Sequence, residues 1–190
     1  MEDINVAGVQ DTVDIAIEVI DYELSVNDMN DLCDSTDAAI ESGGGFGWVK
    51  LPARDILERY WQGIITIPTR TLLVSRIDGV ICGTMILIEP AKNNEAQSFA
   101  VQTTSLFVTP WARRYGVARK LIEKAEQYAI EKGFSVINLD VRETQKAAIS
   151  LYEASGFKEF GRNPCYAKVG GKIIGGRYYS KILNSNIENI

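Results

Sequence analysis

The sequence predicts a single α/β domain in which helices pack against a sheet, and three observations support this prediction. The chain has 190 residues, of which 46% are hydrophobic, so it can bury one good core. Apolar residues switch between the spacing of strands and that of helices in the order βααβββαβαββ. No repeat, linker or low-complexity tract divides the chain, and only its ends, about 1–12 and 184–190, have the composition of loose termini.

The first third of the chain predicts one strand and two helices. Residues 13–21 alternate between apolar and polar side chains, which is typical of a half-buried strand. Residues 25–42 have the pattern of an acidic helix, which the consecutive glycines 43–45 would stop. A loop follows, and residues 53–64 then give a shorter helical pattern.

The middle third predicts three strands. Residues 71–78 and 80–90 are apolar runs that meet at Asp78 and Gly79, a strong signal for a two-residue hairpin turn. Residues 98–108 predict the next strand, which ends before a proline.

The last third predicts a helix, a strand, a helix and a hairpin. From Val117 to Ala129 apolar residues recur at helical spacing with charges opposite, and Gly133 is the expected stop. Residues 134–141 have the pattern of a buried strand, and 144–155 that of a second helix. Residues 157–183 then predict a hairpin.

Charge and residue usage argue against several classes of function. The formal net charge is −5, whereas proteins that bind nucleic acid or anionic membranes use a broad basic face. The first residues are acidic and no long apolar stretch occurs, so we expect a cytoplasmic protein without a membrane segment. The three cysteines lie far apart and histidine is absent, so we expect no metal site and no Ser-His or Cys-His catalysis. Carboxylates, tyrosines, backbone amides and water remain as the chemical groups.

A local cation cluster stands out in this acidic chain. The stretch 109–121, "TPWARRYGVARKL", places Arg113, Arg114, Arg119 and Lys120 around Gly116, where a helical pattern begins. Unpaired amides at a helix N-terminus bind anions, and a glycine lets the backbone approach them closely. The cluster therefore predicts a phosphate site. The alternative is that the glycine only starts a helix and the cations are solvated; neither a Walker loop nor a dinucleotide fingerprint occurs.

Two blocks of the sequence resemble the GNAT superfamily of acetyl-CoA-dependent N-acetyltransferases. "RRYGVA", 113–118, matches the R/Q-x-x-G-x-G/A signature, and "QKAAISLYEASGF", 145–157, is similar to N-x-x-A-x-x-L-Y-x-x-x-G-F. The resemblance implies one acetyltransferase domain over 1–190, with a mixed, mostly antiparallel sheet whose parallel central pair splays apart between flanking helices. Further likeness at 42–48 and 163–183 resembles the tabtoxin-resistance-type small-molecule acetyltransferases.

The resemblance also implies a coenzyme site. Backbone amides of 114–118 would hold the pyrophosphate, with arginines as countercharge, and the strand at 106–108 would bulge and bind the pantetheine and the acetyl carbonyl. Gln145 and Ala148 would face the pantetheine arm. Gln145 stands where the family has asparagine, and the alternative is that it is an ordinary residue on the helix surface. The implied acetyl-CoA residues are Leu106, Phe107, Val108, Arg113, Arg114, Tyr115, Gly116, Val117, Ala118, Arg119, Gln145, Ala148 and Tyr152.

Tyr152 and Asp140 are the predicted catalytic residues. The family's tyrosine in the second block lies beside the coenzyme sulfur, which implies that Tyr152 is the general acid; composition alone would place it in the core. Asp140, near the end of an apolar strand, is the predicted base for the amine, with a simple strand-end aspartate as the alternative. Gln102 stands where the tabtoxin-resistance type has a glutamate, and glutamine cannot act as a base.

The acceptor is the least constrained part of the prediction. The expected residues of the acceptor pocket are Phe46, Trp48, Gln102, Asp140 and Tyr166. The alternative for the three aromatic residues is that they pack in the core or anchor loops. We expect direct acetyl transfer to the primary amine of a small molecule, with neither nucleic acid nor membrane as a partner, and a homodimer is compatible. Acetylation of a protein N-terminus or lysine is one alternative, and a non-catalytic acetyl-CoA sensor is another.

Overall fold

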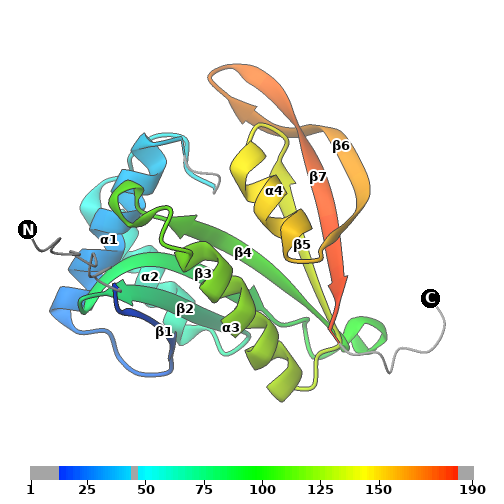
Figure 1. Ribbon diagram of the computed structural model, residues 1–190, viewed down its shortest axis with the longest axis horizontal. Helices are drawn as coiled ribbons and strands as arrows, with labels where there is room; N and C mark the ends of the chain where they lie inside the picture. The colour runs from blue at the N-terminus through cyan, green and yellow to red at the C-terminus, as the bar shows by residue number, and fades with distance from the viewer. Residues whose placement is uncertain (1–12, 44–46, 184–190) are drawn as a thin grey trace, which may run out of the picture.

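The computed structural model describes residues 13–43 and 47–183, which form one seven-stranded sheet with helices on both faces (Figure 1). The strand order is β1-β2-β3-β4-β5-β7-β6, and every neighbouring pair is antiparallel except β4 and β5. The predicted βααβββαβαββ order is confirmed. The bounds are β1 (Ile15–Ile20), α1 (Val26–Glu41), α2 (Arg54–Thr66), β2 (Arg70–Ile77), β3 (Val80–Ile88), β4 (Ala100–Val108), α3 (Val117–Glu131), β5 (Val136–Arg142), α4 (Lys146–Ala154), β6 (Lys158–Val169) and β7 (Lys172–Ile182), with short 3₁₀ turns at Glu95–Gln97 and Pro110–Ala112.

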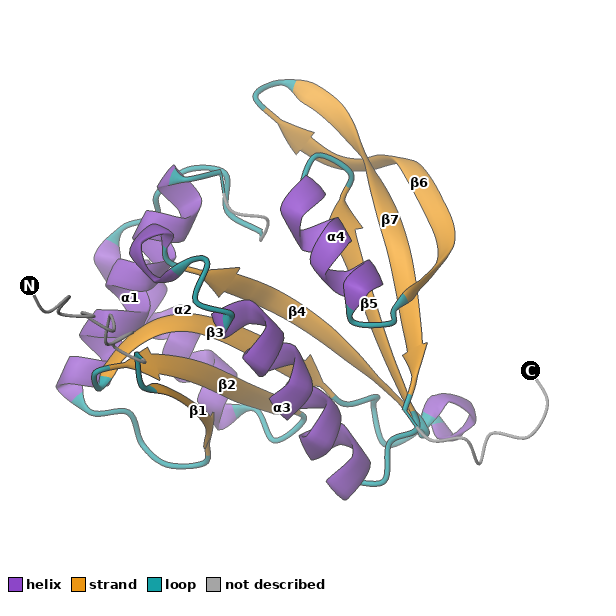
Figure 2. Ribbon diagram, viewed as in Figure 1, coloured by secondary structure: helices purple, strands orange, loops and turns teal. Residues whose placement is uncertain are grey.

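Two hydrophobic clusters fill the two faces of the sheet. Successive side chains on a strand point to opposite faces, so Leu72 and Leu73 on β2 belong to different clusters. Leu72 packs with the buried residues of α1 and α2, including Trp61, whereas Leu73 packs with those of α3 and α4. Figure 2 shows α3 and α4 in front of the sheet and α1 and α2 behind it. The sheet is therefore the middle layer of three.

Both predicted hairpins are present, with the backbone that their turns require. Asp78 and Gly79 have φ of 51° and 83°, and Gly170 and Gly171 have φ of 57° and 80°. Positive φ at both central residues matches the right-handed twist of the flanking strands, and glycine or aspartate tolerates it. The second turn joins β6 to β7.

The sheet opens between its two central strands. β4 and β5 pair at three positions, from Ala100↔Val136 to Gln102↔Asn138, and not beyond them. Figure 1 shows the two strands diverging from this point, with α4 on the β5 side of the gap. The splayed parallel pair that the sequence resemblance implied is therefore confirmed, and the gap positions the site described below.

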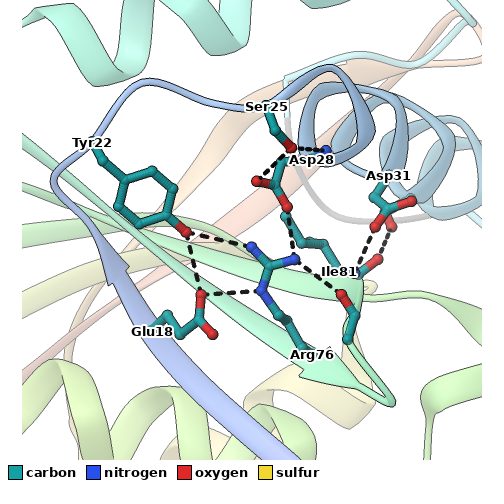
Figure 3. A network of polar contacts seen from close by, with 9 residues as sticks. Glu18, Tyr22, Ser25, Asp28, Asp31, Arg76 and Ile81 are labelled. Atoms are coloured by element: carbon teal, nitrogen blue, oxygen red, sulfur yellow. Dashed lines mark hydrogen bonds and ion pairs between the residues drawn. The ribbon is translucent and has the colours of Figure 1, made fainter.

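A polar network holds β1, the start of α1 and the β2–β3 hairpin together (Figure 3). Arg76 pairs with Glu18 at 3.0 Å and with Asp28 at 2.7 Å, and its guanidinium also donates to the hydroxyl of Tyr22. Ser25 is the N-cap of α1 and accepts a bond from the Asp28 amide. Burial alone would raise the pKa of Asp28, but the bonds from Arg76 and Ser25 outweigh it and hold that pKa below its ordinary value of 3.8.

No helix in the described part of the chain is long and apolar enough to cross a membrane.

Candidate active site

A cavity of about 490 Å³ lies at the gap between β4 and β5, and we call it the main cavity. Residues from the α1–α2 loop, β4, β5, α4 and β6 all reach it, so it joins segments that are far apart in the sequence. It lies at the carboxyl-terminal side of a parallel strand pair, which is where open α/β sheets bind ligands. Its lining includes Gly47, Val49, Thr103, Thr104, Ser105, Leu106, Asp140, Val141, Arg142, Gln145, Ala148, Tyr152, Tyr166, Ala167, Lys168 and Val169.

The wall from β4 contains a bulge. The β3–β4 register shifts between Thr84 and Ile86, and Ser105 opposite this shift has a φ of 53°. The Thr84 hydroxyl donates to the Ser105 carbonyl at 2.9 Å, which fixes this backbone in a conformation that a serine rarely adopts. The resemblance implied a bulge at 106–108, and the observed bulge begins one residue earlier, at Ser105. Close by, Thr103 lines the cavity, and its buried hydroxyl has no hydrogen-bond partner within the described residues.

Tyr152 extends from α4 to the opposite wall of the main cavity. Its side chain is 7% exposed and packs against Phe157 and Tyr179. Burial and the negative charge of Asp140 raise the pKa of Tyr152 well above its ordinary value. Tyr152 is therefore both a core residue and a cavity residue, and the two roles that the sequence offered for it are compatible.

Asp140 lies half-buried on β5 and has both carboxylate oxygens engaged. Oδ1 accepts a bond from the Gln102 amide at 2.9 Å, and Oδ2 accepts one from the Tyr166 hydroxyl. Gln102 on β4, Asp140 on β5 and Tyr166 on β6 thus form one chain of contacts across three strands. A carboxylate oxygen has two lone pairs, so each oxygen keeps a position for a further donor.

An irregular stretch of β6 aims Tyr166 at this carboxylate. Asn163 pairs with Gly176 and Ala167 with Ile174, so β6 gains two residues over β7 between these pairs. The Cys165 amide donates to the Asn163 side chain, which closes a local turn inside this irregular stretch. The Tyr166 ring then lies directly over Gly176, where even a methyl group would clash. Burial and the bond to Asp140 raise the pKa of Tyr166.

The start of α3 has the geometry of an anion site. Gly116 is the N-cap with a φ of 81°, Arg114 has a φ of 72°, and no side chain caps the helix. Within the described residues, the backbone amides of 114–118 have no hydrogen-bond partner. Consecutive free amides in such a loop form an anion-binding concavity, and the helix dipole adds to it. A shallow cavity of about 260 Å³ lies here, lined by residues that include the exposed Arg114 and Arg119.

Two of the sequence-predicted coenzyme residues also make contacts within the chain that the sequence did not predict. Arg113 donates from Nε to the Val108 carbonyl at 3.1 Å and from Nη2 to the Ser42 hydroxyl at 2.7 Å. Its guanidinium therefore ties β4 to the end of α1, and it keeps its positive charge beside the start of α3 because both acceptors are neutral. The Gln145 amide donates to the Gly43 carbonyl at 2.9 Å, so this side chain links α4 to the α1–α2 loop while it lines the main cavity.

The predicted pocket aromatics are only partly brought together. Tyr166 lines the main cavity, whereas Trp48 packs edge-on against Tyr60 at 4.7 Å and lines an adjoining cavity. Phe46 lies outside the described residues. Sequence reasoning missed Ser105 and Thr103, because neither a serine at a bulge nor a threonine on a strand differs in pattern from ordinary strand residues. Among the described residues, no cluster of metal-ligating side chains is found.

Comparison with known proteins decides the family. A model described as "Acetyltransferase (GNAT) family" matches residues 39–157, which is more than half of the chain. The chain belongs to the GNAT acetyltransferase family. The matched range contains the splayed strand pair, α3 and α4, so this acetyltransferase is an acyltransferase by family, as its sequence predicted.

A curated relative and two solved structures agree with this assignment. The acetyltransferase is 53% identical over 133 residues to an uncharacterized N-acetyltransferase from Azospirillum brasilense, a match that covers 70% of this chain and 79% of the relative. An N-acetyltransferase structure from Staphylococcus aureus has a TM-score of 0.76 at 17% identity, covering 90% and 99% of the two chains. An acetyltransferase from Salmonella typhimurium, solved with its cofactor acetyl-CoA, has a TM-score of 0.74 at 16% identity, covering 93% and 98%. Names of other similar structures include acetyltransferases of small molecules and of proteins, so the fold leaves the acceptor open.

The residues of this acetyltransferase fit acetyl-CoA. The free amides at the start of α3 suit a pyrophosphate, because each lone N–H can donate to a phosphate oxygen. Thr103 lines the main cavity and its buried hydroxyl lacks a partner in the described residues, so this side chain has a polar group left over for an amide-containing pantetheine arm. Gly116 has open space where a Cβ would be, so the approach to these amides is unobstructed.

Proposed function

We propose that this acetyltransferase moves the acetyl group of acetyl-CoA directly to the primary amine of a small molecule. The observation that carries the proposal is that Asp140 and Tyr152 line one cavity beside the bulged strand β4. A proton acceptor and a proton donor thus face the same space, which is what amine acetylation needs. When bound, acetyl-CoA supplies an activated thioester carbonyl and a thiolate leaving group.

Asp140 is the proposed base. An alkyl amine whose ammonium form has a pKa of about 10.4 is deprotonated in only about one molecule in 2500 at pH 7. A base that removes this proton therefore raises the rate. Gln102 and Tyr166 each hold one oxygen of Asp140 and fix the carboxylate against rotation. Asp140 takes the proton from the ammonium nitrogen directly or through a water molecule. Gln102 acts as a positioning residue here, since an amide cannot accept the proton.

Tyr152 is the proposed acid, and its link to Asp140 gives the order of proton transfers. The charge of Asp140 contributes to the raised pKa of Tyr152, so this phenol stays protonated while the base is ionised. Once Asp140 has taken the proton of the amine, that charge is neutralised and the pKa of Tyr152 falls. Tyr152 is then a stronger acid at the moment when the thiolate leaves. Its hydroxyl donates its proton to the thiolate sulfur.

Elements on both sides of the gap support a small acceptor. Gly47 and Val49 from the α1–α2 loop and Ala167 and Lys168 from β6 line the same cavity, so these segments flank it on two sides. An extended peptide would need a groove open along its length. This enclosure supports a small-molecule acceptor, as in the tabtoxin-resistance-type enzymes that the sequence resembles, rather than a protein N-terminus or lysine.

The deciding experiment is a screen of amines, amino acids and peptides that follows thiol release from acetyl-CoA. We expect one class of small amine to give the highest kcat/KM. With that acceptor, Tyr152→Phe should lower kcat by about 100-fold while coenzyme affinity changes little, because a general acid acts in the transition state. Preference for peptides would contradict the small-molecule proposal, and a wild-type kcat for Tyr152→Phe would return Tyr152 to a purely packing role.

A further inference from the structure

A second cavity of about 390 Å³, which we call the side cavity, adjoins the main cavity. The two share Gly47, Thr104 and Ser105 in their linings, so the bulge of β4 stands between them. The Ser105 hydroxyl lies 3.4 Å from that of Tyr60, a side-cavity residue, which ties the bulge to α2. A ligand that reaches Asp140 in the main cavity can therefore extend over Ser105 into the side cavity.

The side cavity is mainly apolar and contains one charged residue. Arg70 is the only charged residue in its described lining, which also includes Trp48, Tyr60, Ile64, Ile86 and Ile88. Arg70 is the first residue of β2 and pairs with Ile88 on β3, and its amide donates to the Ile67 carbonyl at 2.9 Å. Its backbone is thus fixed and its side chain partly buried.

The Arg70 guanidinium has no partner among the described residues, either as a hydrogen bond or as an ion pair. By contrast, Arg54, Arg76 and Arg177 each pair with a carboxylate of the chain. A guanidinium beside aromatic and aliphatic walls is weakly hydrated and presents a planar fork of donors. That fork matches a carboxylate, which takes two parallel N–H···O bonds.

We infer that Arg70 binds the carboxylate of the acceptor, so the acceptor class is amino acids with an apolar side chain. This inference rests on the proposed function and deepens it. Asp140 lines the main cavity and Arg70 the side cavity, so a ligand that extends over Ser105 would present an ammonium to Asp140 and a carboxylate to Arg70. The apolar part of the acceptor packs on Trp48, Tyr60 and the isoleucines, and the volume is suited to a small ligand.

The test compares leucine with leucinamide and 3-methylbutylamine as acceptors, measured by thiol release with acetyl-CoA. For the wild-type protein we expect leucine to have a kcat/KM about 10- to 100-fold above the two acceptors without a carboxylate, as for a hydrogen bond to a charged group. Arg70→Met should remove this preference, and Arg70→Lys should keep part of it, because the charge remains without the fork. The amine of leucinamide is less basic than that of leucine, so greater availability of free amine cannot explain a preference for leucine.

Arg59→Met is the matched control. Arg59 lies on α2 next to Tyr60, its side chain is 68% exposed and it pairs only with Asp55, so the variant loses one positive charge without touching the side cavity. Arg59→Met should keep the preference for leucine. If Arg59→Met loses the preference as Arg70→Met does, or if leucine and leucinamide react equally in the wild type, the inference is wrong.

Calorimetry separates this inference from the proposed catalysis. N-acetylleucine and N-acetylleucinamide are titrated into the coenzyme A complex of the wild type and of Arg70→Met. Tighter binding of N-acetylleucine that depends on Arg70, without turnover of any amine, would keep the carboxylate site and refute small-molecule acetylation. Turnover of amines without any effect of Arg70 on rate or binding would refute the carboxylate site and keep the proposed function.

Discussion

Gly176→Ala tests whether Tyr166 positions the proposed base. The added Cβ would lie 2.2 Å from Cγ of Tyr166 and 2.7 Å from its Cβ, so the root of the side chain, not only its tip, must move. Ordinary carbon contacts lie at about 3.5–4.0 Å, so the ring has to shift by roughly 1.5 Å. A shift of that size takes the hydroxyl out of hydrogen-bond range of Asp140, since O–H···O bonds span about 2.5–3.0 Å.

The expected loss follows from the strength of that bond. A hydrogen bond to a charged group is worth about 1.5–3 kcal/mol, so kcat/KM with the best acceptor should fall roughly 10- to 150-fold. Tyr166→Phe removes the same bond without a clash and should give a loss of similar size. If Tyr166 only packs, Gly176→Ala should lower the free energy of unfolding, and Tyr166→Phe should leave kcat/KM unchanged.

Gly161→Ala is the matched control for this prediction. Gly161 lies on β6 in the same hairpin, opposite Tyr178, and its position has no atom within 4 Å of an added Cβ. Its kcat/KM and melting temperature should stay at wild-type values. Equal losses in Gly161→Ala and Gly176→Ala would refute the reasoning, because the effect would then come from adding any methyl group to the hairpin. Full activity in Gly176→Ala would refute it as well.

Three further predictions concern the base, the coenzyme and the fold. Asp140→Asn should lower kcat/KM steeply near pH 7 and recover in part at high pH, where the free amine is abundant; a wild-type pH profile would exclude Asp140 as the base. Gly116→Glu should abolish coenzyme A binding in calorimetry, because it adds a negative charge beside the free amides of α3 and strains a backbone with a φ of 81°. Unchanged affinity in a folded protein would refute the assignment of a phosphate site. Arg76→Met should lower the free energy of unfolding at pH 7 by about 1–2 kcal/mol, because the partly buried Asp28 and the more exposed Glu18 both lose their ion pair with Arg76. Since Arg76 helps to lower the pKa of Asp28, that stabilisation is complete above the ordinary pKa of 3.8 and is lost as the pH falls through the lower folded value, so urea titrations of the two proteins should converge in acid.

Local signals in the sequence were sufficient for much of the fold. The Asp78-Gly79 turn and the periodic helix from Val117 depend on neighbouring residues only, and both are present as predicted. The phosphate-binding prediction has the same local origin, because the amides of one short loop and Gly116 make up the feature. These signals are readable from a single chain since no distant contact is needed to interpret them.

Other features depend on contacts between distant segments. The sequence did not predict the bonds of Arg113 to Val108 and Ser42, which exist only because α1 ends beside β4. Tyr166 reaches Asp140 because β6 gains two residues over β7, and no local pattern in 163–167 specifies that register. The side cavity around Arg70 likewise depends on how α2 lies over β2 and β3, so the residue carried no signal in the sequence.

The short ladder between β4 and β5 has a mechanical consequence. Three paired positions join the two halves of the sheet, and past Gln102 and Asn138 the strands share no backbone bonds that a change in spacing would break. Widening the gap therefore requires the repacking of side chains such as Tyr152 and Leu106 and strains the Gln102–Asp140 bond that spans it, while the antiparallel ladders on either side remain intact. No backbone pairing past these three positions fixes the width of the cavity, so donors with acyl groups larger than acetyl would meet resistance from side chains rather than from the backbone.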